Sequence, residues 1–474
     1  MRNSFPEVFP AVPTDKRSGS ALVLAVLFIG VLVPMIGLAI DGTNVYMMRN
    51  QIQNALNAAV LAGNRSLNLA ADIGSQTANA QTVAMNTFNA NTANMYSGVN
   101  MADIVASSFH VKQNANMTIT VSATGTATLP LMLMGMIPAI TGPTVPFSAS
   151  ASRRSTNIML VLDHSGPMGF NPAIGTPLDV LKADATDFVN NFAQRNGASN
   201  IGLVTYTGAP FVANALPNPY PNYQPNVTAN ISLMAASGWS MTNTAAAMSA
   251  AYGQLRALNQ PGALNVIVLF TEGLAGAFTG NFAGLVTSPP PAYCNPGASP
   301  LNGLLWSNQL EARFGGLGDI TANSINDTPE ARGAPACTSD TYVPDQFLSA
   351  MPTSDIYGNS TNGTGTASLY TQVDLTSIDA NDITAAAENA LDDAANRARG
   401  DASIPATIFV IGLGGNPAAI PPDPLLMPRI ANDPASASYN GNQPAGQYIF
   451  APDTAHLQAA FASIASQVLR LAAR

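Results

Sequence analysis

The longest uninterrupted apolar stretch of the chain lies near its beginning. Residues 18–40 carry no charge, and within them "ALVLAVLFIGVLVPMIGLAI" is almost entirely apolar. A helix of about 20 apolar residues is long enough to cross the roughly 30 Å of hydrocarbon in a bilayer. The pattern therefore predicts a transmembrane anchor over residues 18–40.

The charges on either side of this stretch predict its orientation. Lys16 and Arg17 come directly before it, and Asp41 comes directly after it. Because positively charged flanks stay in the cytoplasm, we expect residues 1–17 to form a cytoplasmic tail and the rest of the chain to lie outside. A cleaved signal peptide ending near Ala39 is the alternative, although its apolar core would exceed the usual ~7–15 residues.

After the anchor, the apolar positions change to a helical spacing. The residues that recur every three or four positions are Val45, Met48, Ile52, Leu56 and Ala59. This spacing is typical of one face of an α-helix. We expect the helix to leave the membrane and continue as an amphipathic stalk over residues 41–70. An ordinary core helix of the outer domain is the alternative interpretation.

Residues 71–152 show a strand pattern instead. In "MTITVSAT", apolar Met, Ile and Val alternate with Thr and Ser, which indicates a half-buried strand in a small β-containing connector. The following segment Leu129–Ile140, "LPLMLMGMIPAI", is apolar but too short to span a bilayer. We expect it to pack on the sheet of the connector, and an interfacial or partner-binding segment is the alternative.

From residue 153 to the end, apolar runs typical of buried strands alternate with helical patterns. The predicted strands are Ile158–Leu162, Ile201–Tyr206, Val266–Phe270 and Thr407–Gly412. Helices are predicted from Pro177, near Ala245, over Ile383–Arg399 and over Ala455–Ala472. This alternation predicts an α/β fold with a doubly wound parallel sheet, whose ligands collect at the carboxyl ends of the strands.

Three loops at those strand ends carry oxygen-bearing side chains. "DHSGP" begins at Asp163, "GWSMTNT" covers Gly238–Thr244, and "LFTEG" covers Leu269–Gly273. The neighbours His164 and Ser165 raise the hypothesis of a hydrolase. Consecutive side chains leaving a strand point apart, however, and the Gly-x-Ser-x-Gly elbow is missing, so we expect no catalytic residues.

Composition narrows the class of partner. Only 9% of residues are charged, the net charge is −9 and the pI is near 4.7. No basic stripe is present to neutralise phosphates, which argues against a nucleic-acid partner. Cys294 and Cys337 lie in one irregular segment and predict a disulfide, since the expected location outside the cytoplasm permits it. Two unrelated buried thiols are the alternative.

The N-terminal residues also resemble a known family. "RSGSALVLAVLFIGVLVPMIGLAIDGTNVYMMRNQIQNALNAAVLAG", Arg17 to Gly63, resembles the N-terminal segment of TadE/TadG-like proteins of the bacterial tight-adherence (Flp) pilus system. The small residues before the span, the Asp after it and the "QNALNAAVLAG" helix carry the resemblance. It implies a single-pass, pilus-associated protein of the bacterial inner membrane, with its bulk in the periplasm or outside the cell.

The three polar loops resemble the metal-ion-dependent adhesion site of von Willebrand factor A domains, which uses Asp-x-Ser-x-Ser, a Thr and an Asp. Asp163, Ser165 and Thr242 match this pattern, Pro167 replaces the second Ser, and Glu272 replaces the Asp. The resemblance implies that the three matching residues and Glu272 hold Mg²⁺ or another divalent cation, with water replacing the lost hydroxyl. A turn without metal, in which the Asp caps local backbone amides, is the alternative.

A long insertion interrupts the predicted A-like domain, which covers residues 153–474. Residues 274–380 are rich in Gly, Pro, Asn, Thr and Ser, where this fold normally needs only a few residues. The insertion leaves from the predicted ligand edge of the sheet and contains both cysteines. Because long loops at such an edge are usually functional, we expect a recognition subdomain that is clamped by the disulfide.

Together these patterns predict a non-enzymatic, membrane-anchored protein of pilus assembly or adhesion. It would present an A-type module with a degenerate metal site to protein partners, either in pilus or secretion machinery or on a surface. Two alternatives stay open at this stage. One is a structural, pseudopilin-like filament component, and the other is a secreted adhesin.

Overall fold

The structure is a computed structural model of the chain. It describes residues 18–67, 73–93, 108–114, 118–137, 139–170, 176–195, 199–219, 222–237, 241–282, 301–308, 313–318, 351–362 and 380–472, with residues 99, 104, 322 and 324–326 between them. The chain separates into two compact units. The first contains Met1–Ala62, Gln81–His110 and Ser122–Ala151, and the second contains Gly63–Ala80, Val111–Val121 and Ser152–Arg474.

The first unit begins with one long helix, α1 (Ser18–Ser66). Among the described residues it is the one helix whose length and composition would allow it to cross a membrane, and its large apolar side chains from Leu22 to Ile40 are exposed. Beyond Asp41 one face becomes buried, including Met48 and Ile52. The helix therefore continues past the apolar stretch, as its spacing predicts, and its apolar face is packed against protein.

A small sheet and a second helix follow α1. The helix is α2 (Ile73–Thr92), and the sheet has the order β1-β2-β3, with β1 (Phe109–Gln113), β2 (Thr118–Thr128) and β3 (Thr144–Arg154). Ile119 and Val121 point inward from β2, which confirms the strand predicted from alternation. The side chain of Gln53 in α1 donates to the carbonyl oxygen of Ser148 in β3 over 2.9 Å. Sequence reasoning missed α2, because its many Asn and Thr residues have a low helix propensity.

The apolar segment Leu129–Ile140 does not pack on this sheet, so that expectation is wrong. It connects β2 to β3 and contains a short 3-10 turn, η2 (Met134–Met136). The backbone N–H of Leu129 donates a hydrogen bond to the carbonyl oxygen of Pro143 at the end of the β2–β3 pair. The rest of the segment extends beyond this last hydrogen bond. Leu129 itself is buried, but Met132, Leu133, Met136 and Ile137 are exposed, since no sheet face lies beneath them.

The second unit is built on a six-stranded sheet in the order β12-β11-β7-β4-β5-β6. Neighbouring strands pair in parallel, except that β6 runs antiparallel to β5. The strands are β4 (Thr156–Asp163), β5 (Ser199–Tyr206), β6 (Pro210–Asn214), β7 (Leu264–Thr271), β11 (Ala406–Leu413) and β12 (Gln447–Ala451). The predicted doubly wound parallel sheet is confirmed, and the two edge strands β6 and β12 are additional to the four predicted strands.

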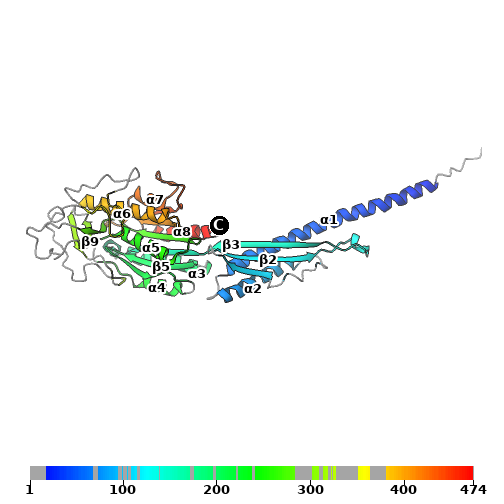
Figure 1. The fold of residues 1–474 in the computed structure, drawn as a ribbon, viewed down its shortest axis with the longest axis horizontal. Helices are drawn as coiled ribbons and strands as arrows, with labels where there is room; N and C mark the ends of the chain where they lie inside the picture. Colours follow the sequence, from blue (N-terminus) through cyan, green and yellow to red (C-terminus); the bar gives the residue numbers. More distant parts are fainter. Residues whose placement is uncertain are drawn as a thin grey trace, which may run out of the picture. The chain divides into compact units, whose positions relative to one another are not determined.

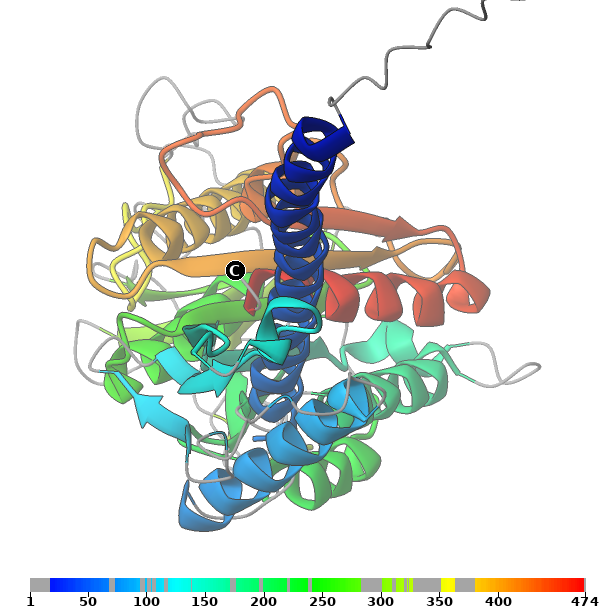
Figure 2. The ribbon, with the colours of Figure 1, turned by 90° about the vertical axis from the view of Figure 1, so that its right-hand side faces the viewer.

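Helices cover both faces of this sheet (Figures 1 and 2). The helices are α3 (Pro177–Arg195), α4 (Tyr223–Leu233), α5 (Thr244–Leu258), α6 (Ala380–Gly400), α7 (Leu426–Ala431) and α8 (Leu457–Ala472). Successive residues of β4 divide between the two layers: Leu160 packs with α3, α4 and α8, and Met159 packs with α5, α6 and α7. In Figure 2, α6 (yellow-orange) and α8 (red) lie on opposite sides of the sheet. Because both faces of these strands are buried, their sequences are apolar at nearly every position.

Part of the predicted insertion is also described. Strands β8 (Ala277–Phe282), β9 (Leu301–Asn308) and β10 (Arg313–Gly318) form an antiparallel sheet in the order β10-β9-β8. Trp306 is buried in it beside Met241. Asp355 is buried and accepts hydrogen bonds from the backbone of Tyr357 and Asn359. Both cysteines lie outside the described residues.

Candidate metal centre

Loops from four strands meet where the strand order reverses around β4. The strand that follows β4 in sequence, β5, lies on one side of it, and β7 lies on the other. Asp163 at the end of β4 is level with Tyr206 of β5, while Leu162 is level with Phe270 of β7. Open α/β sheets bind ligands at such a switch point. Backbone pairing therefore holds the predicted ligand loops together, although they are far apart in sequence.

Asp163 leaves the end of β4 with a fully buried side chain. Its Oδ1 accepts a hydrogen bond from the backbone N–H of Ser165 over 2.9 Å, and its Oδ2 accepts one from the hydroxyl of Thr271 over 3.3 Å. Burial raises the pKa of Asp163 to about 6, and these hydrogen bonds counteract part of the increase. The carboxylate therefore carries a desolvation cost that a nearby positive charge would offset.

Ser165 is also buried, and its hydroxyl is available to bind a ligand. Its Oγ has no hydrogen-bond partner within the described part of the chain, although it is near enough to Asp163 to lower the pKa of that carboxyl. A buried hydroxyl without a good partner is costly. His164 faces elsewhere, since its Nδ1 lies 2.9 Å from the carbonyl oxygen of Ala235 and burial lowers its pKa to about 4.

Glu272 directly follows β7 and is as buried as Asp163. Burial and the charge of Asp163 raise the pKa of Glu272 to about 8, and a hydrogen bond from Asn416 partly lowers it. Its Oε1 has no hydrogen-bond partner among the described residues. The charge of Asp163 thus disfavours ionisation of Glu272 in a buried position, as happens where two carboxylates share one site.

Asn416 belongs to this cluster, although sequence reasoning missed it. It follows β11, and its side-chain amide donates to the carbonyl oxygen of Pro167 over 2.9 Å and to Oε2 of Glu272 over 3.0 Å. Gly415 has a φ of +77°, and a Cβ there would lie 2.6 Å from the carbonyl oxygen of Pro452. The turn therefore requires glycine. The sequence signal that could have identified Asn416 was the position of "GGN" directly after an apolar strand.

Thr242 is buried in the loop before α5. Its carbonyl oxygen accepts a hydrogen bond from the backbone of Gly276, in the chain that follows Glu272. The next residue, Asn243, caps α5 and donates its backbone N–H to the carbonyl oxygen of Thr207 over 2.8 Å. Thr207 follows β5, and its Oγ1 is buried without a partner in the described structure. The second predicted loop is thus attached to the loops after β5 and β7.

The donor set fits a hard divalent cation. Within the described ranges, no group of three or more His, Cys, Asp or Glu side chains gathers that could hold a metal ion. A cation here would instead depend on two carboxylates and on hydroxyl oxygens, which suit Mg²⁺. The buried, unpartnered oxygens of Ser165 and Glu272 are free to serve as ligands. Pro167 supplies no side-chain oxygen, and its carbonyl is used by Asn416.

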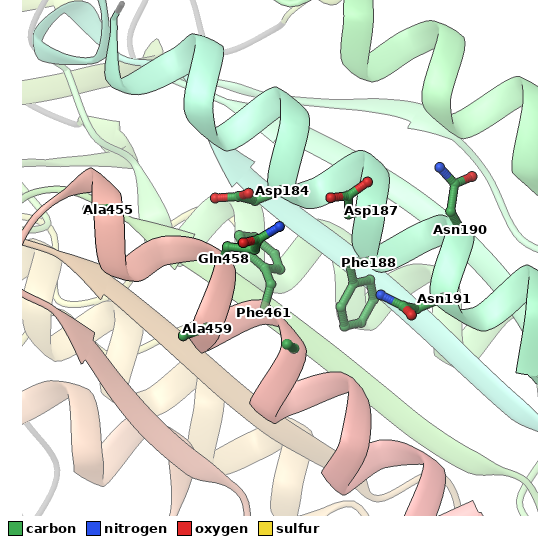
Figure 3. A pocket seen from close by; sticks show the side chains of 10 residues that line it. Asp184, Asp187, Phe188, Asn190, Asn191, Ala455, Gln458, Ala459 and Phe461 are labelled. Carbon is green, nitrogen blue, oxygen red and sulfur yellow. The ribbon is translucent and has the colours of Figure 1, made fainter. Parts of the chain in front are cut away.

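A second pair of carboxylates lies apart from this cluster, in a hollow of about 430 Å³ between α3 and α8 (Figure 3). Asp184 and Asp187 line it from α3, and Gln458 and Phe461 line it from α8. Asp184 is only 6% exposed, and its Oδ2 has no partner in the described ranges. Burial and the charge of Asp187 raise the pKa of Asp184 to about 6. Neither carboxylate belongs to a motif that is visible in the sequence.

Two family models match separate parts of the chain. Residues 19–80 match the putative Flp pilus-assembly TadE/G-like family, and residues 157–281 match the von Willebrand factor type A domain. The second match contains Asp163, Ser165, Thr242 and Glu272. No curated protein matches the sequence.

Several solved structures are similar to the chain. The PilB minor pilin from Streptococcus sanguinis has 13% identity and a TM-score of 0.37, covering 79% of each chain. The vWF domain of the type V pili tip protein Mfa5 from Porphyromonas gingivalis has 16% identity and a TM-score of 0.36, covering 68% of this chain and 97% of that one. Proximal thread matrix protein 1 from the mussel byssus, with a zinc-occupied MIDAS motif, has 9% identity and a TM-score of 0.32, covering 67% and 48%.

The long apolar N-terminal helix and the parallel sheet with its polar edge agree with the two family matches. Von Willebrand A domains often bind a metal at their metal-ion-dependent adhesion site, and Tad-like proteins are associated with pili. The chain joins a TadE/G-like N-terminal segment to a von Willebrand factor type A domain.

Proposed function

We propose that this protein is a non-enzymatic, membrane-anchored component of pilus assembly or adhesion, which presents its von Willebrand A domain to a protein partner. Residues 1–17 form the cytoplasmic tail, 18–40 the anchor, 41–70 the stalk helix, 71–152 the connector and 153–474 the A domain. The match of residues 19–80 to the TadE/G-like family supports the pilus association. The exposed apolar surface of α1 from Leu22 to Ile40 supports the anchor.

The observation that carries the role of the A domain is the buried pair Asp163 and Glu272. Their pKa values are raised by burial, and Glu272 and Ser165 each keep an oxygen without a partner in the described part of the chain. We assign Asp163, Ser165, Thr242 and Glu272 as the residues that hold Mg²⁺ or another divalent cation. This arrangement supports a weakened adhesion site that has kept its carboxylates.

The chain's own residues prepare this site for a cation. The backbone N–H of Ser165 and the hydroxyl of Thr271 orient the carboxylate of Asp163, and Asn416 orients that of Glu272. Such supporting hydrogen bonds commonly decide metal affinity. A bound divalent cation would supply a positive charge to which an oxygen ligand of the partner could coordinate.

A binding role is also supported over a hydrolytic one. A serine nucleophile needs a histidine nitrogen within about 3 Å of its hydroxyl. The Nδ1 of His164 instead pairs with the carbonyl oxygen of Ala235, and burial keeps the ring neutral. We therefore assign no catalytic residue to this cluster.

The binding role is tested by capturing partners from bacterial envelope membranes with the tagged full chain. Wild type should retain a partner in Mg²⁺ and lose it in a chelator, and Asp163→Ala should fail in both conditions. Asp187→Ala is the matched control, because it removes an exposed carboxylate from α3. Capture of the same partner by Asp163→Ala would contradict a role of this site in binding.

Membrane topology and processing need separate tests. A reporter that is active only outside the cytoplasm, fused after Arg474, should be active, because Lys16 and Arg17 favour a cytoplasmic N-terminus. An intact chain in the membrane fraction supports the anchored protein. A shortened secreted chain would favour the free adhesin, and co-purification with sheared filaments would favour the structural pilin-like component.

A further inference from the structure

The connection between β2 and β3 ends in an exposed apolar segment, Leu129–Ile140, which we call the apolar tip. Met136 is 79% exposed and Met132 is 55% exposed, and Leu133 and Ile137 are also exposed. The surrounding sequence is unusual as well, because no Asp, Glu, Lys or Arg occurs from Gln113 to Ser152. Contiguous exposed apolar side chains of this kind mark a contact with a partner or with a membrane.

Asp41 holds the tip against α1. Its carboxylate accepts backbone hydrogen bonds from three consecutive residues of the tip, Met132, Leu133 and Met134, over 2.6 to 3.2 Å. These bonds, with that from Met134 the strongest, hold the pKa of Asp41 below its usual range. The carboxylate is shielded from solvent and satisfies the backbone donors of the tip. The same hydrogen bonds offset part of the cost of holding the carboxylate and the backbone donors of the tip away from water.

The contact continues to the end of the apolar stretch of α1. A Cβ added at Gly37 would lie 3.4 Å from Sδ of Met134 and 3.6 Å from Cβ of Leu133. On the other side of Asp41, the side chain of Asn44 donates to Sδ of Met132 over 3.2 Å. From Gly37 to Asp41 the helix rises only about 6 Å. The tip thus lies level with the outer end of the segment that we propose as the membrane anchor (Figures 1 and 2).

We propose that the apolar tip enters the outer face of the lipid bilayer beside α1, as a second membrane contact of the chain. This inference rests on the proposed anchor. If Leu22–Ile40 spans the bilayer, the tip is held at the level where hydrocarbon meets the headgroups, and it has no charge to oppose insertion.

Lipid fits the tip better than a protein partner for two reasons. The exposed side chains of the tip continue the exposed apolar surface of α1 without an intervening ring of charged residues other than Asp41, whose carboxylate is already paired. Burial of an exposed Met, Leu or Ile side chain in an apolar phase is favourable, and the bilayer is the apolar phase nearest to this position.

Depth-dependent fluorescence quenching tests the proposal with the full chain. An environment-sensitive fluorescent amino acid is introduced at one position at a time by stop-codon suppression, which leaves both cysteines in place. The positions are Met136 in the tip, Val31 in α1 and Ser150 in β3. The protein is reconstituted in vesicles of phosphatidylethanolamine and phosphatidylglycerol, and quenching by nitroxide-labelled lipid is compared with quenching by iodide in the water.

The three positions give distinct expectations. Val31 is 57% exposed in the middle of the apolar stretch, so its label should be quenched by deep nitroxides and protected from iodide. The label at Met136 should respond most to shallow nitroxides, with iodide quenching several-fold weaker than at Ser150. Ser150 is exposed on β3, away from the tip, and its label should respond to iodide alone.

The outcomes separate this inference from the anchor on which it rests. If Val31 responds to lipid while Met136 responds like Ser150, the anchor stands and the tip does not enter the bilayer. Protection of Met136 from both quenchers would assign the tip to a protein contact and also overturn the proposal. If Val31 itself responds only to iodide, the anchor and the inserted tip both fail.

Discussion

The side-chain amide of Asn416 donates a hydrogen bond to Oε2 of Glu272 over 3.0 Å, joining loops 144 residues apart in the sequence. The same amide donates to the carbonyl oxygen of Pro167. Pro167 stands where the adhesion-site pattern has its second serine, and Glu272 replaces the usual aspartate. Asn416 therefore connects these two positions. The two departures from the pattern lie in one hydrogen-bonded group.

Replacement of Asn416 by alanine should raise the pKa of Glu272 above about 8, because the hydrogen bond that favours its charged form is lost. Above that pH, the free energy of unfolding should fall by about 1–3 kcal/mol, the cost of leaving a buried acceptor unpaired. Urea unfolding and carboxyl NMR measure the two effects. Asn442→Ala, an exposed control, should change stability by less than about 0.5 kcal/mol. An unchanged pKa of Glu272 would show that the hydrogen bond from Asn416 does not stabilise its charged form.

The double substitution Pro167→Ser and Glu272→Asp should restore the full adhesion-site pattern. It adds a hydroxyl and shortens the carboxylate to its usual reach, while the backbone carbonyl at position 167 still accepts from Asn416. Magnesium affinity, measured by calorimetry, should rise on the order of ten- to a hundredfold. Asp163→Ala should abolish binding in either background. If only the double variant binds, the native site has lost its metal and recognition must lie in the insertion.

Cation affinity should increase with pH from about 6 to above 8. A cation binds carboxylates rather than carboxylic acids, and the pKa values of Asp163 and Glu272 are raised to about 6 and about 8. Calorimetry in buffers of different ionisation enthalpy should show protons released on binding. Without cation, stability should fall as pH rises from about 4 through 8, because the folded chain must then ionise these buried groups. An affinity independent of pH would exclude Glu272 as a ligand.

Asp184→Asn should stabilise the A domain at neutral pH. The pKa of Asp184 is raised to about 6, so the folded state loses stability as pH rises from about 4 through 6. A rise in pKa from 3.8 to about 6 limits the gain to about 3 kcal/mol, and the open hollow reduces it to about 1–2 kcal/mol. Thermal unfolding should show the gain at pH 7 and none below about pH 4. Asp187→Asn, which changes the exposed neighbour, should give a smaller gain at pH 7.

The cysteines give a prediction outside the described residues. Protein taken from the bacterial envelope with its thiols blocked should migrate differently on reducing and non-reducing gels. Mass spectrometry should identify a linked Cys294–Cys337 peptide, because an oxidising compartment favours the pairing of two cysteines in one segment. Detection of both residues as blocked free thiols would end the hypothesis of a disulfide-clamped insertion.

Local patterns were sufficient for most of the architecture. The strands β4, β5, β7 and β11 follow from apolar runs that are buried on both faces, and α3 follows from its helical spacing. The end of β4 at Asp163 could likewise be read from the sequence, since the run of apolar residues stops there. Such features depend on neighbours in the chain, and periodicity records those directly.

Contacts between distant segments required the folded chain. The pairing of Asn416 with Glu272 depends on the sheet order, which brings the loops after β7 and β11 together, and no local pattern encodes that order. The apolar tip misled the sequence analysis for the same reason. Its composition indicated burial, but its place beyond the end of the β2–β3 ladder leaves it exposed, and its backbone donors find Asp41, about 90 residues earlier, through three-dimensional packing.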